Sequence, residues 1–262
     1  MPTIHAGDAS LHYRDAGSGN EAVLLLHAFP LHSAMWGPQL TALSRFHVIA
    51  PDYRGLGQSR PAPAASTMDL LAGDVLALLR QLGIRRVAVA GSSMGGYVAF
   101  ELYRRAPELV RGLALVDTKA TPDTEEQKAG RETYAASALA EGLGWVASDF
   151  APRLLRPQAD PSVEATVRSL IKEGTPEGVA AAQRGMARRP DSVPTLGRIT
   201  CPAAVIFGEE DQVIPFAEAQ RMANTVKGAR LVRIPAAGHL PNMENPNAFN
   251  AALSQFFASL PA

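Results

Sequence analysis

The chain has 262 residues with 25 basic and 25 acidic side chains, so its formal net charge is zero; 47% of its residues are hydrophobic and 19% are charged. This balance argues against nucleic-acid binding, which normally needs a basic surplus, and against intrinsic disorder, which needs more net charge and less apolar content. The length permits one large α/β domain or two small ones, and we expect a small molecule as the partner.

Cysteine content and apolar runs bear on the compartment. Cys201 is the single cysteine, so no intramolecular disulfide can form, and we predict a reducing, cytoplasmic location. The first ten residues lack the basic start and apolar core of a signal peptide, and the longest purely apolar runs are about five residues against roughly twenty for a membrane span. The sequence signals for dinucleotide, nucleotide triphosphate and zinc sites are missing, so we expect neither a cofactor nor a metal.

The chain opens on an alternating pattern and continues with short apolar runs. Residues 4–6 and 11–14 alternate polar and apolar side chains, which is typical of an antiparallel hairpin at a sheet edge. Continuous apolar runs bounded by turn residues then indicate strands buried on both faces of a parallel sheet. These runs are residues 23–26, 48–50, 87–90, 113–116 and 203–207, with a sixth, 231–234, interrupted by Arg233.

Helical patterns separate these runs. They cover residues 33–43, 68–82, 94–105, 216–226 and 246–260. The alternation predicts an α/β fold: a mostly parallel sheet with an antiparallel N-terminal edge and helices on both faces.

Residues 121–197 differ in character, because Ala, Arg and Glu dominate and strand-like runs vanish. Asp160 and Thr175 each precede a proline, as expected for helix N-caps followed by proline at the first helical position. We predict a helical cap over residues 121–197, inserted into a core domain formed by residues 1–120 and 198–262.

The sequence Gly91-Ser92-Ser93-Met94-Gly95 matches G-x-S-x-G. It follows the apolar run 87–90 and opens a helical stretch, which is the strand, sharp turn and helix arrangement of a nucleophile elbow. The alternative is an ordinary Gly/Ser-rich turn, but this context favours Ser93 as a nucleophile.

A serine hydroxyl needs a base and a carboxylate that orients the base. His239 lies just beyond the strand pattern that ends near residue 234, and Asp211 directly follows the one that ends at residue 207. Both should therefore reach the carboxyl edge of the sheet, where Ser93 also lies. The chain order Ser, Asp, His is the order described for α/β-hydrolase triads.

Other histidines and acids compete for these roles. We interpret His5, His12 and His47 as surface or rim histidines and leave His27 and His32 as intermediate cases. Glu209, Glu210 and Asp117 are rival acids, for which a solvated loop charge or a helix cap is the preferred interpretation.

Acyl transfer also needs donors for the oxygen that becomes negative. The Met94 N–H should lie at a helix N-terminus, next to the nucleophile. The second donor should come from the loop after residues 23–26, where Phe29 is best placed and Pro30 has no N–H.

These residues resemble the α/β-hydrolase superfamily, in particular its small cofactor-free esterases, lactonases and perhydrolases. Besides the elbow, the resemblance rests on four segments. They are His27-Ala28-Phe29-Pro30, similar to the family's H-G-F-P loop; residues 52–59, similar to D-x-R-G-x-G-x-S; residues 208–215, similar to G-x-x-D-x-x-x-P; and Gly238-His239.

The resemblance implies Ser93 as nucleophile, His239 as base, Asp211 as its partner, and the Phe29 and Met94 amides as oxyanion hole. Ala28 departs from the family's glycine, and alanine tolerates a positive φ poorly, so the loop geometry depends on this residue.

The sequence therefore predicts a serine hydrolase that cleaves a small carboxylic ester or lactone through an acyl-enzyme intermediate. The alternatives are a cofactor-free perhydrolase, resembling family members with proline after the oxyanion residue, a C–C bond hydrolase, and a hydrolase-fold sensor without turnover.

Aromatic side chains suggest an apolar substrate pocket. Trp36, Trp145 and Phe150 are its candidates, although core or cap packing competes with this role. Arg184, Arg188 and Arg189 could bind an anion, but a charged helix face is the preferred interpretation. The oligomeric state is not predicted.

Overall fold

The computed structural model describes residues 2–261, and its strands form one eight-stranded sheet. From edge to edge the strands are β1 Thr3–Ala6, β2 Ala9–Ala16, β4 His47–Pro51, β3 Ala22–Leu26, β5 Val87–Ser92, β6 Val110–Val116, β7 Ala203–Gly208 and β8 Arg230–Ile234. The pairs β1–β2 and β2–β4 are antiparallel and the remaining pairs are parallel. The predicted mostly parallel sheet with an antiparallel N-terminal edge is confirmed.

Burial of the strands follows their place in the sheet. Every residue of β3, β5, β6 and β7 is buried, as the continuous apolar runs predict for central strands. In β8, by contrast, only the last residue is buried, because this strand forms the outer edge.

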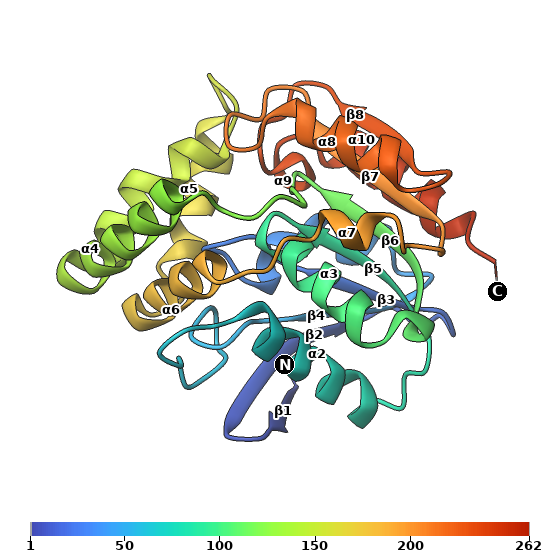
Figure 1. The fold of residues 1–262 in the computed structure, drawn as a ribbon, viewed down its shortest axis with the longest axis horizontal. Coiled ribbons are helices and arrows are strands. Elements are labelled where there is room, and N and C mark those ends of the chain that lie inside the picture. Colours follow the sequence, from blue (N-terminus) through green and yellow to red (C-terminus); the bar gives the residue numbers. More distant parts are fainter. Residues whose placement is uncertain (1, 262) are drawn as a thin grey trace.

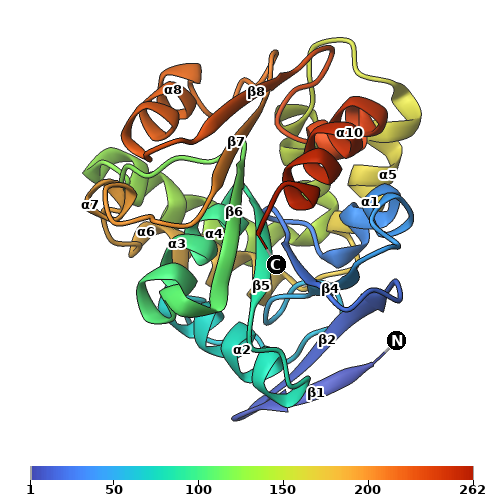
Figure 2. The ribbon, with the colours of Figure 1, turned by 90° about the vertical axis from the view of Figure 1, so that its right-hand side faces the viewer.

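Helices cover both faces of the sheet (Figure 2), with α2, α3 and α8 on one side and α1 and α10 on the other. Their bounds are α1 Gly37–Ala42, α2 Met68–Gln81, α3 Met94–Arg105, α8 Phe216–Thr225, α9 Pro241–Glu244 and α10 Pro246–Ala258, with short 3-10 helices at Ser33–Trp36 and Pro107–Leu109.

The single helix predicted over residues 33–43 is divided in two. A 3-10 turn, Ser33–Trp36, precedes α1, and Pro38 lies in the first turn of α1. Because proline lacks an N–H, it suits a helix start rather than a helix interior, and a new helix begins there.

A run of helices separates β6 from β7 without any strand among them. They are α4 Glu125–Phe150, a 3-10 helix Ala151–Leu154, α5 Pro161–Ile171, α6 Pro176–Ala187 and α7 Val193–Leu196. The predicted caps are present, since the side chains of Asp160 and Thr175 accept from the N–H groups of Ser162 and Gly178. Helices α4, α5 and α6 gather at one end of the sheet (Figure 1).

The helices within residues 2–261 are each too short or too polar to cross a lipid bilayer.

Candidate active site

Ser93 occupies the sharp turn between β5 and α3. Its backbone has φ +52° and ψ −114°, an uncommon conformation for a residue with a side chain. Hydrogen bonds to both backbone groups of Ser93 hold this turn. The Ser93 N–H donates to Val116 O at 2.8 Å, and Thr118 Oγ1 donates to Ser93 O at 2.7 Å. The Ser93 side chain makes no capping bond to α3, so its hydroxyl remains available.

The two glycines of the motif allow the backbone to reverse at this turn. A Cβ added to Gly91 would lie 2.4 Å from Gly95 O, and one added to Gly95 would lie 2.2 Å from Leu26 O. Both partners are backbone atoms, so any side chain here would force the strand and the helix apart. These contacts explain the motif sterically.

Asp211 and His239 meet at the carboxyl edge of the sheet. Asp211 follows β7 and His239 follows β8, and His239 Nδ1 lies 2.8 Å from Asp211 Oδ2. The other oxygen of Asp211 accepts N–H bonds from Val213 and Ile214 at 2.7 and 3.2 Å. Because an ionised carboxylate only accepts, the proton lies on Nδ1 and Nε2 keeps its lone pair.

Asp211 is held ionised despite complete burial of its side chain. Burial alone would raise its pKa, but the charge and hydrogen bond of His239 and the two backbone N–H groups lower the pKa below its ordinary value.

Asp117 lies next to this pair, which corrects its interpretation as a solvated loop charge or a helix cap. Asp117 is 1% exposed, and its Oδ1 accepts the N–H of Gly208 at 2.8 Å. Burial and the nearby charge of Asp211 raise the pKa of Asp117 well above its ordinary range. The raised pKa favours the protonated form of Asp117 beside the ionised Asp211.

Asp117, Asp211 and His239 each place one potential metal-ligand atom within 4.8 Å of the others. His239 Nδ1 contacts Asp211 Oδ2, and Asp117 Oδ1 accepts the N–H of Gly208. In this arrangement Asp211 supports His239, and Asp117 is bonded to the backbone at the end of β7.

Two N–H groups of the loop after β3 are already bonded, and one of its residues lacks an N–H. Ala28 N–H donates to Met35 Sδ at 3.3 Å, Leu31 N–H donates to Ala28 O at 2.9 Å, and Pro30 has no N–H. The Phe29 N–H is left as the candidate donor of this loop. Met94 is the first residue of α3, where helix N–H groups have no intrahelical acceptor.

Ala28 fits the loop without the backbone strain that its methyl group could cause. The described non-glycine residues with positive φ are Ser93, Asp117, Gln158 and Ala236, and Ala28 is not one of them. The loop therefore does not need the left-handed conformation that favours glycine.

His27 anchors the same loop. Its Nε2 accepts the N–H of Tyr53 at 3.0 Å, so its Nδ1 carries the proton and donates to Ala28 O at 3.0 Å. Complete burial lowers the pKa of His27 to about 4, which keeps the ring neutral.

His12 is not the surface or rim histidine that its place in a strand suggested. Its Nδ1 contacts Asp52 Oδ2 at 2.9 Å, and Asp52 also accepts from the N–H groups of Ser33 and Gln58. Asp52 thus joins three backbone segments, which makes the motif at residues 52–59 a structural support.

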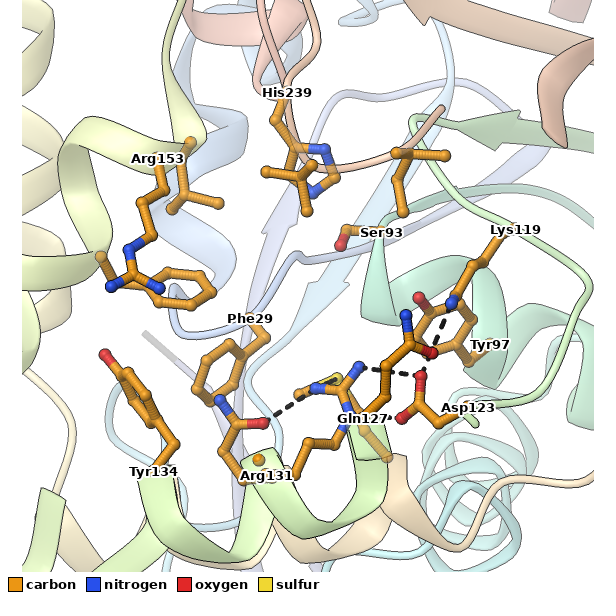
Figure 3. A pocket seen from close by; sticks show the side chains of 17 residues that line it. Phe29, Ser93, Tyr97, Lys119, Asp123, Gln127, Arg131, Tyr134, Arg153 and His239 are labelled. Carbon is orange, nitrogen blue, oxygen red and sulfur yellow. Dashed lines mark hydrogen bonds and ion pairs between the residues drawn. The ribbon is translucent and has the colours of Figure 1, made fainter. Parts of the chain in front are cut away.

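A cavity of about 280 Å³ lies beside Ser93, and Figure 3 draws its 17 lining residues. On one side, which we name the serine side, lie Phe29, Ser93 and His239. Among the predicted pocket residues, Phe150 also lines the cavity, and its ring contacts the ring of Phe29 edge-on at 5.2 Å between centroids.

The two predicted tryptophans lie outside this lining. Trp36 is fully buried and packs against Phe249, with ring centroids 6.2 Å apart. Trp145 packs behind Tyr134 at 4.9 Å between centroids, and Tyr134 rather than Trp145 faces the cavity. Core and helix packing therefore accounts for both tryptophans.

Another part of the cavity lining is charged, which the sequence did not predict. We name Lys119, Asp123 and Arg131 the charged side (Figure 3). Arg189, which is outside the cavity lining, forms an ion pair with Asp123. Arg189 is 6% exposed, so the interpretation of a solvated helix face is wrong for it, whereas Arg184 does pair with exposed Glu132 on the surface.

Comparisons with known proteins agree on one family. A sequence model described as the alpha/beta hydrolase fold matches residues 21–246. A thermophilic esterase from Thermogutta terrifontis superposes with a TM-score of 0.94 at 39% identity, covering 98% of this chain and 97% of that one. An enol-lactonase from Burkholderia xenovorans superposes with a TM-score of 0.91 at 31% identity, covering 98% and 100%.

A non-heme haloperoxidase from Rhodococcus erythropolis is 30% identical in sequence over 99% of this chain and 100% of its own length. Two of these three relatives are thus named as hydrolases, an esterase and an enol-lactonase, and the third is named as a haloperoxidase.

Proposed function

The chain belongs to the alpha/beta hydrolase fold family, and from that premise we propose that it is a serine hydrolase that cleaves a small carboxylic ester or lactone through an acyl-enzyme intermediate. The observation that carries the proposal is the hydrogen-bonded pair of His239 and Asp211 lining one cavity with Ser93 on its strained turn. The enol-lactonase and esterase relatives support this substrate class.

Ser93 is the nucleophile and His239 the general base. His239 Nε2 takes the hydroxyl proton while Ser93 Oγ attacks the carbonyl carbon, and the same proton then passes to the leaving oxygen. Asp211 holds the imidazole in the tautomer with a proton on Nδ1 and stabilises its charge when Nε2 is protonated. A water molecule, deprotonated by His239, releases the acyl group.

The N–H groups of Phe29 and Met94 form the oxyanion hole of this proposal. Removing one such donor typically costs a few kcal/mol of transition-state stabilisation, so the hole contributes much of the rate. His27 supports it by fixing the carbonyl of Ala28, next to the Phe29 amide.

The helical segment 121–197 acts as the cap of the site. Gln127, Arg131 and Phe150 of α4 and Gln183 of α6 line the cavity that Ser93 lines from the sheet. The cap thereby limits which substrates reach the serine. The cytoplasmic location predicted from the single cysteine is part of this proposal.

Perhydrolysis is the second candidate function. Pro30 directly follows the oxyanion residue Phe29, and a relative of 30% identity is named a haloperoxidase. In this reaction hydrogen peroxide, in place of water, would attack the acyl-enzyme and yield a peracid.

A labelling experiment combined with a substrate panel tests the proposal. A fluorophosphonate should modify Ser93 in the native protein and should not modify the Ser93→Ala variant. The native protein should then be assayed on a short-chain ester, a lactone, acetate with peroxide, and a vinylogous diketone.

Turnover of the ester or lactone that Ser93→Ala abolishes would support the proposal, whereas undiminished turnover in this variant would refute it. Faster reaction with peroxide or with the diketone would favour a perhydrolase or a C–C bond hydrolase. Labelling of Ser93 without turnover of any substrate would favour a sensor protein.

A further inference from the structure

The charged side of the cavity holds more positive than negative charge. Asp123 contacts Arg131 Nε, Arg189 Nη2 at 2.7 Å and Lys119 Nζ at 3.5 Å. The carboxylate of Asp123, a residue that is 6% exposed, is thus the shared partner of three cationic side chains. An additional negative group would be favoured next to this cluster.

The two arginines have their donors largely used within the protein. Arg131 Nη1 donates to Gln183 Oε1 at 2.8 Å, and Arg189 donates to the carbonyls of Met186 and Thr121 at 2.9 and 3.1 Å. The guanidinium of Arg189 also lies over the ring of Tyr97, 4.3 Å from its centroid. These contacts fix the arginines as the rigid base of the cluster.

Lys119 differs from them because its ammonium group is incompletely paired. Its distance of 3.5 Å to Asp123 exceeds the 2.7–2.9 Å of a good charge-assisted hydrogen bond. The ammonium has three donors, and its side chain lines the cavity although it is only 13% exposed. Burial lowers the pKa of Lys119, so a bound anion would relieve a desolvated charge.

A second donor lies on the same side of the cavity. Gln127 Oε1 accepts the N–H of Thr124 at 3.1 Å in the capping box of α4. That bond fixes the orientation of the amide, whose NH₂ group remains free to donate into the cavity that Gln127 lines (Figure 3).

We propose that Lys119, assisted by Gln127, binds a carboxylate group of the substrate. The site would therefore prefer esters or lactones whose acyl part carries a free carboxylate, over neutral ones. Such a substrate bridges the cavity, with its scissile carbonyl at Ser93 and its carboxylate at Lys119. The volume of about 280 Å³ restricts it to a short chain, such as a hemiester of a small dicarboxylic acid. This inference rests on the proposed function.

The test compares matched charged and neutral substrates. Ethyl hydrogen succinate, glutarate and adipate are the charged esters, and the ethyl esters of the corresponding monoamides are their neutral counterparts of nearly equal size. We expect the native protein to show a higher kcat/KM for the charged ester of at least one chain length, and added salt should reduce this preference.

Lys119→Met keeps an unbranched side chain of similar size and removes its charge, while Asp123 keeps both arginine partners. In this variant the ratio of kcat/KM for the charged ester to kcat/KM for the neutral ester should fall by roughly tenfold to hundredfold, because a hydrogen bond to a charged group is lost. We expect the change mainly in KM. Lys119→Arg should retain part of the preference. Lys172→Met, which removes an exposed lysine outside the cavity lining, should leave the ratio at the native value.

Calorimetry with glutarate on the Ser93→Ala protein separates this inference from the proposed function. Glutarate binding that disappears in the Ser93→Ala, Lys119→Met double variant supports the carboxylate site even if no ester is turned over. Serine-dependent turnover with equal kcat/KM for charged and neutral esters, or glutarate binding that Lys119→Met leaves unchanged, would overturn the site and leave the proposed function intact.

Discussion

The serine side and the charged side of the cavity are built in different ways. On the serine side, Ser93 follows β5 and His239 follows β8, two parallel strands of one sheet, and backbone hydrogen bonds fix the turns that carry them. On the charged side, ion pairs among side chains join residues far apart in the chain, such as Asp123 and Arg189.

We infer from this difference that the serine side carries out the reaction and the charged side recognises the substrate. Strand ends hold reacting groups to a narrow geometry, because a shift would break backbone hydrogen bonds across the whole sheet. A cluster of side chains on helices and loops can be exchanged residue by residue without disturbing that geometry. We therefore expect the same substitution, aspartate to asparagine, to have three different outcomes at the three buried aspartates around this cavity.

Asp211→Asn should produce the largest effect. The amide carries no charge to stabilise a protonated His239 and weakens the preference for the proton on Nδ1, so kcat for a neutral ester should fall by about 10³ to 10⁴-fold. Steady-state kinetics near pH 7, with circular dichroism as a check of folding, measures this loss.

The matched control for this variant is Glu210→Gln, which removes a half-exposed charge from the same loop and should leave kcat unchanged. A loss of less than about tenfold in Asp211→Asn would show that another group orients His239, contrary to the assigned roles.

Asp123→Asn should affect stability more than chemistry. It leaves Arg131 and Arg189 without their carboxylate partner, and breaking a buried ion pair in this way costs about 3 kcal/mol or more of unfolding free energy. The pKa of Asp123 is lowered in the folded protein, so its stabilisation is present above the ordinary value of 3.8 and is lost as the pH falls below it.

Urea denaturation at pH 7 and at pH 3 to 4 measures the difference between Asp123→Asn and the native protein, which should shrink at the lower pH. Glu132→Gln breaks the exposed pair with Arg184 and should cost at most about 1 kcal/mol. If Asp123→Asn stays folded and yet loses neutral-ester turnover as severely as Asp211→Asn, the separation of the two sides is wrong.

The serine side was predictable because each of its parts is local in the sequence. The elbow is a run of five residues between a strand and a helix, and Asp211 and His239 each directly follow a strand pattern. Parallel strands bring the residues that follow them to the same edge of the sheet. The order of the strands therefore predicts contacts between residues that no single motif contains.

The charged side was not predictable, because charged residues in loops and helices are usually solvated. Lys119, Asp123 and Arg189 have no spacing that distinguishes them from surface residues, and Asp123 meets Arg189 only after the chain has traversed α4 to α6. The formal net charge of zero conceals a local excess of positive charge around Asp123.

Asp117 shows a signal that the sequence did contain. It directly follows the buried strand β6, between β5 and β7, so the reasoning that placed Ser93 and Asp211 at the sheet edge would also have placed Asp117 there. It was instead interpreted as a solvated loop charge or a helix cap, whereas burial raises its pKa and allows a second carboxyl beside Asp211.

Asp117→Asn should therefore have the smallest effect on turnover and a favourable effect on stability. Asparagine can still accept the N–H of Gly208 and carries no charge beside Asp211. Because the folded pKa of Asp117 is raised above 3.8, the folded protein binds more protons than the unfolded chain above that pH, and stability declines as the pH rises. Asparagine does not titrate and removes this decline.

The variant and the native protein should be compared by urea denaturation from pH 4 to pH 8. The unfolding free energy of Asp117→Asn should exceed the native value at pH 7, and the gap should close toward pH 4, while kcat/KM stays close to native. Asp69→Asn, the same exchange at an exposed residue, should show no such gap. A less stable Asp117→Asn protein with a kcat loss like that of Asp211→Asn would mean that Asp117 is ionised and shares the orientation of His239 with Asp211.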